Sequence, residues 1–215
     1  MMLIALADMI QAHQMNITGV LHVGAHEGEE AAAYQNAGIH NVWWVEGNPE
    51  LIDLLTKRIA RARVGPGHRI INALVTDVDG DDVTFHVTNN MQSSSILEFG
   101  THRRVSPDVH FTHDLTLLTR TLESLIDEHN INANFWNLDI QGAELLALEG
   151  AGERIQMADY VYTEINVDEL YRGCVRLPEL DQFFDGIGFV RCDTRLAGPR
   201  VGWGDALYVR RGVRP

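Results

Sequence analysis

The sequence predicts an α/β fold with a mostly parallel central sheet. Over the first 75 residues, short apolar runs alternate with stretches whose apolar residues recur at helical spacing, and this order is typical of βαβ units. The composition, with 45% hydrophobic and 22% charged residues, is that of an ordinary globular protein. A length of 215 residues, without a repeat or a low-complexity segment, indicates one domain over residues 1–215.

The chain begins with a leading segment, residues 1–18, whose apolar spacing predicts a helix over residues 2–13. Residues 19–24 form a short apolar run that ends in glycine, as a buried strand does. An alanine-rich stretch at residues 27–37 is stopped by Gly38, which indicates a helix.

The next elements repeat this alternation. Residues 41–46 predict a second strand, and Asn48 and Pro49 then provide the N-cap and the first-turn residue of a helix over residues 50–61. A third strand is expected at residues 69–75. Strands that are separated by helices in this way pair in parallel.

The alternation stops after the third strand. Residues 77–82 are typical of a tight acidic turn, and residues 83–87 alternate like one strand of a hairpin. Residues 88–113 are polar and rich in serine and histidine, so we expect a long loop that serves as a lid or a substrate loop. Beyond it we expect helices at residues 122–129, 143–149 and 177–184, and strands at residues 134–139, 160–165, 189–192 and 206–210.

The net charge and the cysteines exclude several classes of protein. A formal charge of −13 repels phosphate backbones, so nucleic acid is not an expected partner. Cys174 and Cys192 form neither a disulfide framework nor a zinc pattern, which favours the reducing cytoplasm. The apolar run at residues 2–10 is too short for a membrane span and lacks the preceding basic residues of a signal peptide.

In an open parallel sheet, ligands bind at the carboxyl ends of the strands. The first strand ends in a turn between Gly24 and Gly28, where glycine allows a cofactor to approach the backbone. Glu46 ends the second strand, where an acidic residue holds the ribose hydroxyls of an adenosine cofactor. The turn lacks the third glycine of the dinucleotide fingerprint, and the acidic helix start after it opposes a pyrophosphate. A sulfonium cofactor without phosphate fits better; the alternative is a simple helix-entry turn.

Three acidic residues are expected to meet at the same edge. Asp139 and Glu164 end strands, and Glu144 lies one turn into the helix after Asp139. Like charges at one mouth raise one another's proton affinity, which makes a general base available. Alternatively, Gln141 and Glu144 cap the start of that helix. Such acids are also compatible with a divalent metal, but no compact ligand pattern indicates one.

The histidines allow two interpretations each. His22 lies within the first strand and fits a core position, whereas His26 lies in the glycine turn and faces the cofactor. His102, His110 and His113 belong to the polar loop, where they are either solvated or include one general base.

Five segments of the sequence, in this order, resemble the FkbM-type S-adenosylmethionine-dependent methyltransferases. They are VLHVGAHEG at residues 20–28, VEGNP at 45–49, SSSIL at 93–97, TLESL at 121–125 and LDIQGAE at 138–144. The resemblance implies a class I methyltransferase (Rossmann-like) fold, an α/β fold whose mostly parallel seven-stranded sheet has helices on both faces and an antiparallel last strand. It also implies methylation of a hydroxyl, often on a sugar or a natural-product scaffold.

The resemblance further implies roles for individual residues. The glycine turn would surround the methionine part of the cofactor, Glu46 would hold the ribose, and Asp139 would lie near the transferred methyl group. Many members have Asp where this chain has His22 and Asn where it has His26, so the contact with the cofactor's amino group differs here. The residues expected to bind the cofactor are Gly24, Ala25, His26, Gly28, Glu46, Asn48, Asn72, Ala73 and Asp139.

We therefore expect an S-adenosylmethionine-dependent O-methyltransferase that acts on a sugar, a glycan building block or a natural-product scaffold and releases S-adenosylhomocysteine. Asp139 is the expected general base, with Glu164 and His113 as alternatives by position. The rival functions are a non-catalytic adenosine-cofactor-binding module and an NAD-dependent oxidoreductase. The expected acceptor contacts are Ser94, Ser95, Gln141, Glu144, Asn166 and Trp203, of which Trp203 alternatively belongs to a turn.

Overall fold

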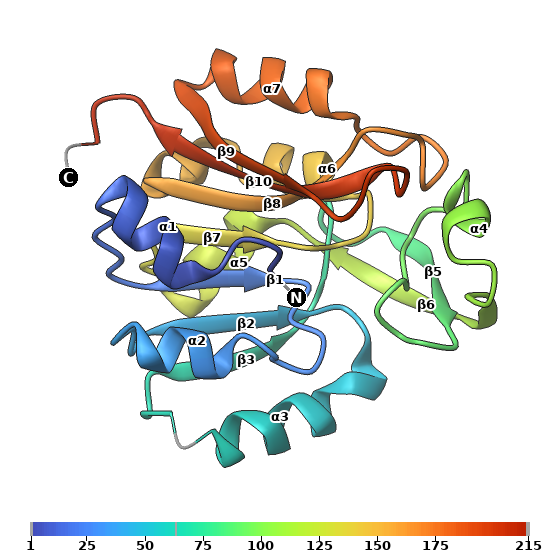
Figure 1. Ribbon diagram of the computed structural model, residues 1–215. Coiled ribbons are helices and arrows are strands. Elements are labelled where there is room, and N and C mark those ends of the chain that lie inside the picture. Colours follow the sequence, from blue (N-terminus) through green and yellow to red (C-terminus); the bar gives the residue numbers. More distant parts are fainter. Residues whose placement is uncertain (1, 63, 214–215) are drawn as a thin grey trace.

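A seven-stranded sheet forms the centre of the structure (Figure 1), a computed structural model that describes residues 2–62 and 64–213. The sheet has the strand order β3-β2-β1-β7-β8-β10-β9. The strands from β3 to β8 in this order pair in parallel, whereas β10, the last strand, is antiparallel to both β8 and β9, as predicted. Their bounds are β1 (Val20–Val23), β2 (Val42–Glu46), β3 (His68–Asn72), β7 (Phe135–Leu138), β8 (Tyr160–Asn166), β9 (Phe189–Leu196) and β10 (Trp203–Arg210).

Helices cover both faces of this sheet (Figure 1). One face carries α1 (Leu6–His13), α2 (Ala31–Asn36) and α3 (Ile52–Arg61); the other carries α5 (Leu122–His129), α6 (Glu144–Glu149), the 3-10 helix η2 (Gly152–Met157) and α7 (Leu177–Gly186). Successive strand residues point to opposite faces, so Val20 packs with the first group of helices and Leu21 with the second. No helix in the described part of the chain is long and apolar enough to cross a membrane.

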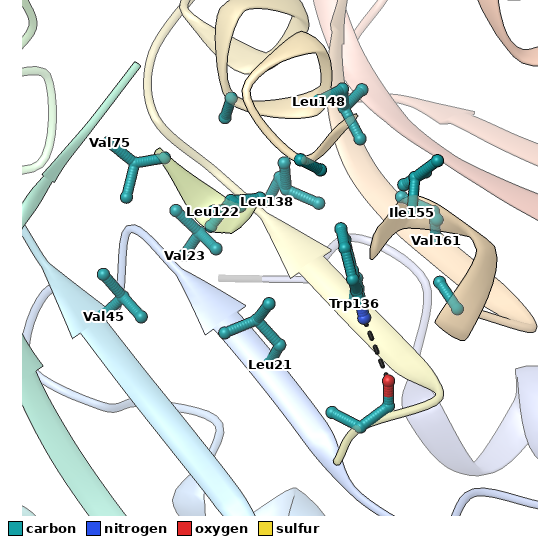
Figure 2. Close-up of a cluster of buried hydrophobic side chains, with 14 of the residues drawn as sticks. Leu21, Val23, Val45, Val75, Leu122, Trp136, Leu138, Leu148, Ile155 and Val161 are labelled. Carbon is teal, nitrogen blue, oxygen red and sulfur yellow. Dashed lines mark hydrogen bonds between the residues drawn. The ribbon is translucent and has the colours of Figure 1, made fainter. Parts of the chain in front are cut away.

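The core beneath α5 and α6 is shown in Figure 2. Leu21 of β1 and Trp136 and Leu138 of β7 lie there, all nearly inaccessible to solvent. The indole N–H of Trp136 donates to the carbonyl oxygen of Ala133 at 3.0 Å. The N–H donor of this buried indole is therefore satisfied.

The first half of the chain differs from prediction mainly at element ends. Residue 1 of the leading segment lies outside the described residues, and its helix α1 begins only at Leu6. Helix α2 begins at Ala31, because the preceding residues form turns in which Ala31 N donates to the carbonyl oxygen of Gly28 at 3.1 Å. Asn48 caps the next helix as predicted, although the first turn is the 3-10 helix η1 (Pro49–Leu51).

The predicted loop over residues 88–113 contains more regular structure than expected. Strand β5 (Asp82–Thr88) pairs antiparallel with β6 (Phe111–Arg120), and β4 (Leu74–Val75) pairs in parallel with β6. The predicted strand at residues 69–75 is thus divided between two sheets. Half of the residues of β6 are exposed and only one is buried, so its apolar pattern was too weak to predict it. The segment between β5 and β6 contains the short helix α4 (His102–Val105) and buries residues 93–95.

The buried position of Leu21 gives a test of this packing. We expect Leu21→Ala to lower the free energy of unfolding by about 2–5 kcal/mol, because the lost side chain leaves a cavity. Denaturant unfolding followed by circular dichroism measures this change. Leu54→Ala is the matched control, since Leu54 on α3 is 39% exposed, and it should cost at most about 1 kcal/mol. Equal losses in the two variants would contradict the packing described here.

Candidate functional site

Two adjoining cavities open at the carboxyl ends of the parallel strands. The first contains about 570 Å³ of empty space, including its mouth. It lies against β1, β2 and the smaller sheet, which has the strand order β4-β6-β5. The second contains about 1380 Å³ on the same measure and lies against β1, β7, β8 and β10. The junction between them is formed by the residues that line both, which are Gly24, His26, Gln92, Asp139 and Gln141.

A glycine is required where β1 ends at this junction. Gly24 has a φ of +82°, and a Cβ atom there would lie 1.9 Å from the carbonyl oxygen of Asp139. Any other residue would strain the backbone and push the ends of β1 and β7 apart. Gly28 has a different role. It leaves room for Leu55 of α3, since a Cβ atom on Gly28 would lie 2.8 Å from Leu55 Cδ1, and it lines neither cavity.

Glu46 is buried at the end of β2 and lines the first cavity. Its Oε1 accepts a hydrogen bond from Asn48 N and its Oε2 accepts one from His26 N, both at 2.7 Å. Burial raises the pKa of this carboxyl, although the two N–H donors oppose the shift. A carboxylate has about four lone-pair sites, so Glu46 retains acceptor capacity for two ligand hydroxyls.

An ion pair borders the junction. His26 Nδ1 lies 2.8 Å from Glu29 Oε1. Burial alone would lower the pKa of His26 and raise the pKa of Glu29, but the hydrogen bond and the opposite charges outweigh burial. The pKa of His26 is therefore raised, and the pKa of Glu29 is lowered to about 2.

The side-chain amide of Gln141 joins two carboxyl groups across the junction. Its Nε2 donates to Asp139 Oδ1 at 2.6 Å and to Glu164 Oε2 at 2.9 Å. Burial, and then the charges of neighbouring carboxyl groups, raise the pKa of Glu164 well above its usual range. The structure thus brings together the two strand-end acids that the sequence singled out.

Glu144, the third of those acids, faces neither cavity. Its Oε1 accepts hydrogen bonds from Ile140 N at 3.0 Å and from Gly142 N at 3.1 Å. Burial raises the pKa of this fully buried carboxyl to about 7. Glu144 therefore holds the turn that carries Gln141, in line with the helix-start alternative and not with an acceptor contact.

The N-terminal segment closes one side of the second cavity. Met2 and Leu3 line it, and Leu3 N donates to Asp205 Oδ2 at 2.7 Å. The Tyr162 hydroxyl also donates to Asp205 and accepts from Ile4 N at 3.1 Å. Burial raises the pKa of Asp205 to about 6. No sequence pattern links the first residues of the chain to β10, so these contacts escaped prediction.

His22 belongs to a buried polar cluster behind the junction. Its Nδ1 lies 3.0 Å from the Tyr34 hydroxyl, which also accepts from Asn137 Nδ2 at 3.1 Å. Burial lowers the pKa of His22 to about 4, so the imidazole is neutral at pH 7. It lines the second cavity as a hydrogen-bonding group without charge.

The remaining predicted residues divide between the cavities and their surroundings. Ala73 and Ser94 line the first cavity, whereas Ala25 and Trp203 line the second. Trp203 is the first residue of β10 and does not belong to a turn. The predicted residues that line neither cavity are Gly28, Asn48, Asn72, His113, Glu144, Ser95 and Asn166.

Hydrogen bonds explain several of these positions. Asn48 is occupied with its helix cap, and Asn72 Nδ2 donates to the carbonyl oxygen of Glu46 at 2.7 Å. His113 is exposed on β6, where its Nε2 lies 3.2 Å from Glu50 Oε1. Among the described residues, no three His, Cys, Asp or Glu side chains are grouped so as to hold a metal ion.

One comparison with known proteins identifies a family. The family model of the methyltransferase FkbM domain matches residues 22–192. No curated protein matches the sequence.

Several solved structures have a similar fold. Magnesium protoporphyrin IX methyltransferase from Synechocystis PCC 6803, with bound S-adenosylmethionine, has 10% identity and a TM-score of 0.56 over 95% of this chain and 75% of that chain. Ribosomal protein L11 methylase from Lactobacillus delbrueckii subsp. bulgaricus has 12% identity and a TM-score of 0.53 over 96% of this chain and 76% of that chain. TrmK from M. capricolum, with S-adenosylhomocysteine, has 8% identity and a TM-score of 0.54 over 91% of this chain and 62% of that chain. Identities this low show a shared fold alone.

The ion pair at the junction makes a testable prediction. Replacing Glu29 by Gln should lower the pKa of His26, because the Glu29 carboxylate makes the largest contributions that oppose burial. NMR titration of the imidazole Cε1–H measures this shift, and His68, which burial also affects but which Glu29 does not contact, is the internal control. An unchanged His26 pKa would contradict the pairing.

The same pair fixes the pH window of its contribution to stability. The raised pKa of His26 stabilises the fold below pH 6.5, and this contribution is lost as the pH rises through the folded-state pKa. The lowered pKa of Glu29 stabilises the fold above pH 4.5, and this contribution is lost as the pH falls toward about 2. The difference in unfolding free energy between the parent and Glu29→Gln should therefore be largest between these two limits.

Proposed function

Because the chain belongs to the methyltransferase FkbM domain family, as five sequence segments predicted, we propose that it methylates a hydroxyl of a small polyhydroxylated acceptor. A sugar, a glycan building block and a natural-product scaffold all fit this description. The chain is an S-adenosylmethionine-dependent methyltransferase, and this decides against the nicotinamide alternative. The observation that carries the proposal is the junction at which Gly24, Asp139 and Gln141 line both cavities.

The first cavity fits the adenosine part of the cofactor. Glu46 offers a buried carboxylate to the ribose hydroxyls, and Leu74 and Phe85 are among the apolar side chains that would enclose the adenine. Bound S-adenosylmethionine supplies an electrophilic methyl group. Gly24 would allow the cofactor to pass close to the backbone from one cavity into the other.

The second cavity fits positive or neutral groups. Among the described residues that line it, carboxyl side chains are frequent and Lys and Arg are absent. Carboxylates near Gly24 would offset the ammonium and sulfonium charges of the cofactor. An acceptor with a phosphate or a carboxylate would lose its hydration beside these acids without gaining a Lys or Arg partner. We therefore favour a neutral or amine-bearing acceptor. The acids concerned are Glu29, Glu30, Asp139, Glu164 and Asp205.

Asp139 is the proposed general base. It lies at the junction, where an acceptor hydroxyl in line with the methyl group would come within hydrogen-bond reach of a carboxylate. Glu164 is less suited by position, because it lines only the second cavity, whereas Asp139 lines both. His113 is exposed and paired with Glu50, so we do not retain it as a base.

The segment between β5 and β6 is the proposed lid. It contributes Met91 and Ser94 to the first cavity and Asn90, Ser93 and His102 to the second. Both ligands would therefore contact it. Closure of such a segment excludes water from the reacting groups.

The ribose role of Glu46 is tested by Glu46→Gln. We expect this variant to bind S-adenosylhomocysteine about 10- to 100-fold more weakly, because hydrogen bonds to a charged group contribute about 1.5–3 kcal/mol. Isothermal calorimetry measures the affinity. Glu50→Gln, which changes an exposed carboxylate on η1, is the matched control and should bind like the parent. Unchanged affinity in Glu46→Gln would remove Glu46 from the ribose site.

The base assignment is tested by Asp139→Asn. We expect turnover to fall by about 10²-fold or more, the usual size of a general-base contribution, while binding of S-adenosylhomocysteine is mostly kept. Transfer of a labelled methyl group to a panel of neutral and amine-bearing polyols measures turnover, with Asp53→Asn on the exposed side of α3 as the control. Loss of cofactor binding would make Asp139 a cofactor ligand. Parental turnover would move the role of base to Glu164.

A further inference from the structure

Gln141 lies in a turn whose backbone leaves little freedom. Both Gln141 and Gly142 have positive φ angles, of +57° and +99°. The carbonyl oxygen of Gln141 accepts a hydrogen bond from Ser95 Oγ at 2.9 Å, and Glu144 holds the two N–H groups on either side. The main chain of Gln141 is therefore fixed from three directions. Its side-chain amide can still turn by a half rotation, which would exchange the positions of its oxygen and nitrogen atoms.

The hydroxyl of Tyr171 distinguishes the two orientations of this amide. Its single proton has two acceptors within reach, Gln141 Oε1 at 2.7 Å and the carbonyl oxygen of Ser93 at 3.2 Å, and the shorter contact makes Gln141 Oε1 the acceptor. The nitrogen end is then directed to Asp139 and Glu164, which accept from it. In the opposite orientation, Oε1 would face both carboxyl groups, where an ionised carboxylate repels it.

Tyr171 is itself held firmly and lies behind the site. It is fully buried, and its ring packs against Phe99 and His102, with centroid distances of 5.7 and 5.4 Å. Gly142 makes room for it, because a Cβ atom on Gly142 would lie 3.2 Å from Tyr171 Cβ. Tyr171 lines neither cavity, so it acts on a ligand only through another residue.

We propose that Tyr171 is a positioning residue. It orients the Gln141 amide so that its two N–H groups bind two carboxyl groups, Asp139 at the junction and Glu164 in the second cavity. This inference rests on the proposed function, since it concerns the acids next to the methyl-transfer centre. Its consequence is electrostatic. Donation from Gln141 favours the charged form of Glu164, against burial and against the negative charges of Asp139, Glu144 and Asp205 that face it. Without Tyr171, this opposing hydrogen bond is lost and Glu164 holds its proton to higher pH.

A comparison of two ligands reports this change without any acceptor. S-adenosylmethionine carries a sulfonium charge that S-adenosylhomocysteine lacks, so the ratio of their association constants should rise as Glu164 loses its proton. Calorimetry between pH 5 and pH 9 measures the ratio and its midpoint. In Tyr171→Phe we expect the midpoint to rise by about one pH unit, the shift that corresponds to one lost hydrogen bond to a charged group.

A double-mutant cycle shows whether Tyr171 acts through the amide. Gln141→Leu should raise the midpoint by a similar amount, and Tyr171→Phe should add nothing in that background. Tyr208→Phe is the matched control, because it removes a buried tyrosine's hydrogen bond to Asp181 far from the junction. Its effect on thermal unfolding should resemble that of Tyr171→Phe, while its midpoint should equal the parent's.

The possible results separate the inference from its premise. Three results would each overturn the positioning role. The midpoint could be unchanged in Tyr171→Phe, or Tyr171→Phe could shift the midpoint as much in the Gln141→Leu background as in the parent. The ratio of association constants could also fail to vary with pH in the parent. If neither ligand bound the parent, the proposed function would fail, and this inference would fail with it.

Discussion

Buried carboxyl groups at one edge of the sheet are the constraint on which the site depends. A carboxylate that leaves water loses several kcal/mol of hydration unless the protein replaces those interactions. Here the replacement comes largely from backbone N–H groups. Glu46 binds two of them after β1 and β2, and Glu144 binds two after β7, while Glu164 receives the Gln141 amide. The loops at this edge therefore take conformations that direct N–H groups to these acids, and the cavities lie between the loops.

This origin explains which parts of the site the sequence could predict. Gly24, Glu46, Asp139 and Glu164 all lie at strand ends, and the carboxyl ends of parallel strands meet at one edge. Once the βαβ alternation was recognised, their proximity followed from topology alone. The same holds for the sheet, because short apolar runs separated by helices leave few other arrangements. The antiparallel last strand was implied by the family resemblance and not by the residue pattern.

Other parts of the site depend on contacts that no local pattern encodes. Leu3 and Asp205 are 202 positions apart, and Tyr171 and Gln141 are 30 apart, so neither hydrogen bond has a signature in the sequence. The role of Glu144 depends on the φ angles of the turn before it, which a glycine suggests but does not determine. Strand β6 was missed for a different reason, since half of its residues are exposed and only one is buried. Hydrophobic periodicity predicts neither exposed strands nor buried polar contacts well.

Two of the family segments, SSSIL and LDIQGAE, are joined by one hydroxyl group in the structure. Ser95 Oγ donates to the carbonyl oxygen of Gln141 at 2.9 Å and accepts from Leu97 N at 3.0 Å. The Tyr171 hydroxyl, which binds the Gln141 amide, also lies 3.2 Å from the carbonyl oxygen of Ser93. The segment between β5 and β6 is thus anchored at its buried serines to the turn that carries the amide. A movement of the whole segment would break the contacts that orient Gln141, whereas movement on either side of the serines would leave them intact. The same hydroxyl groups therefore connect access to the cavities with the arrangement of the carboxyl groups between them.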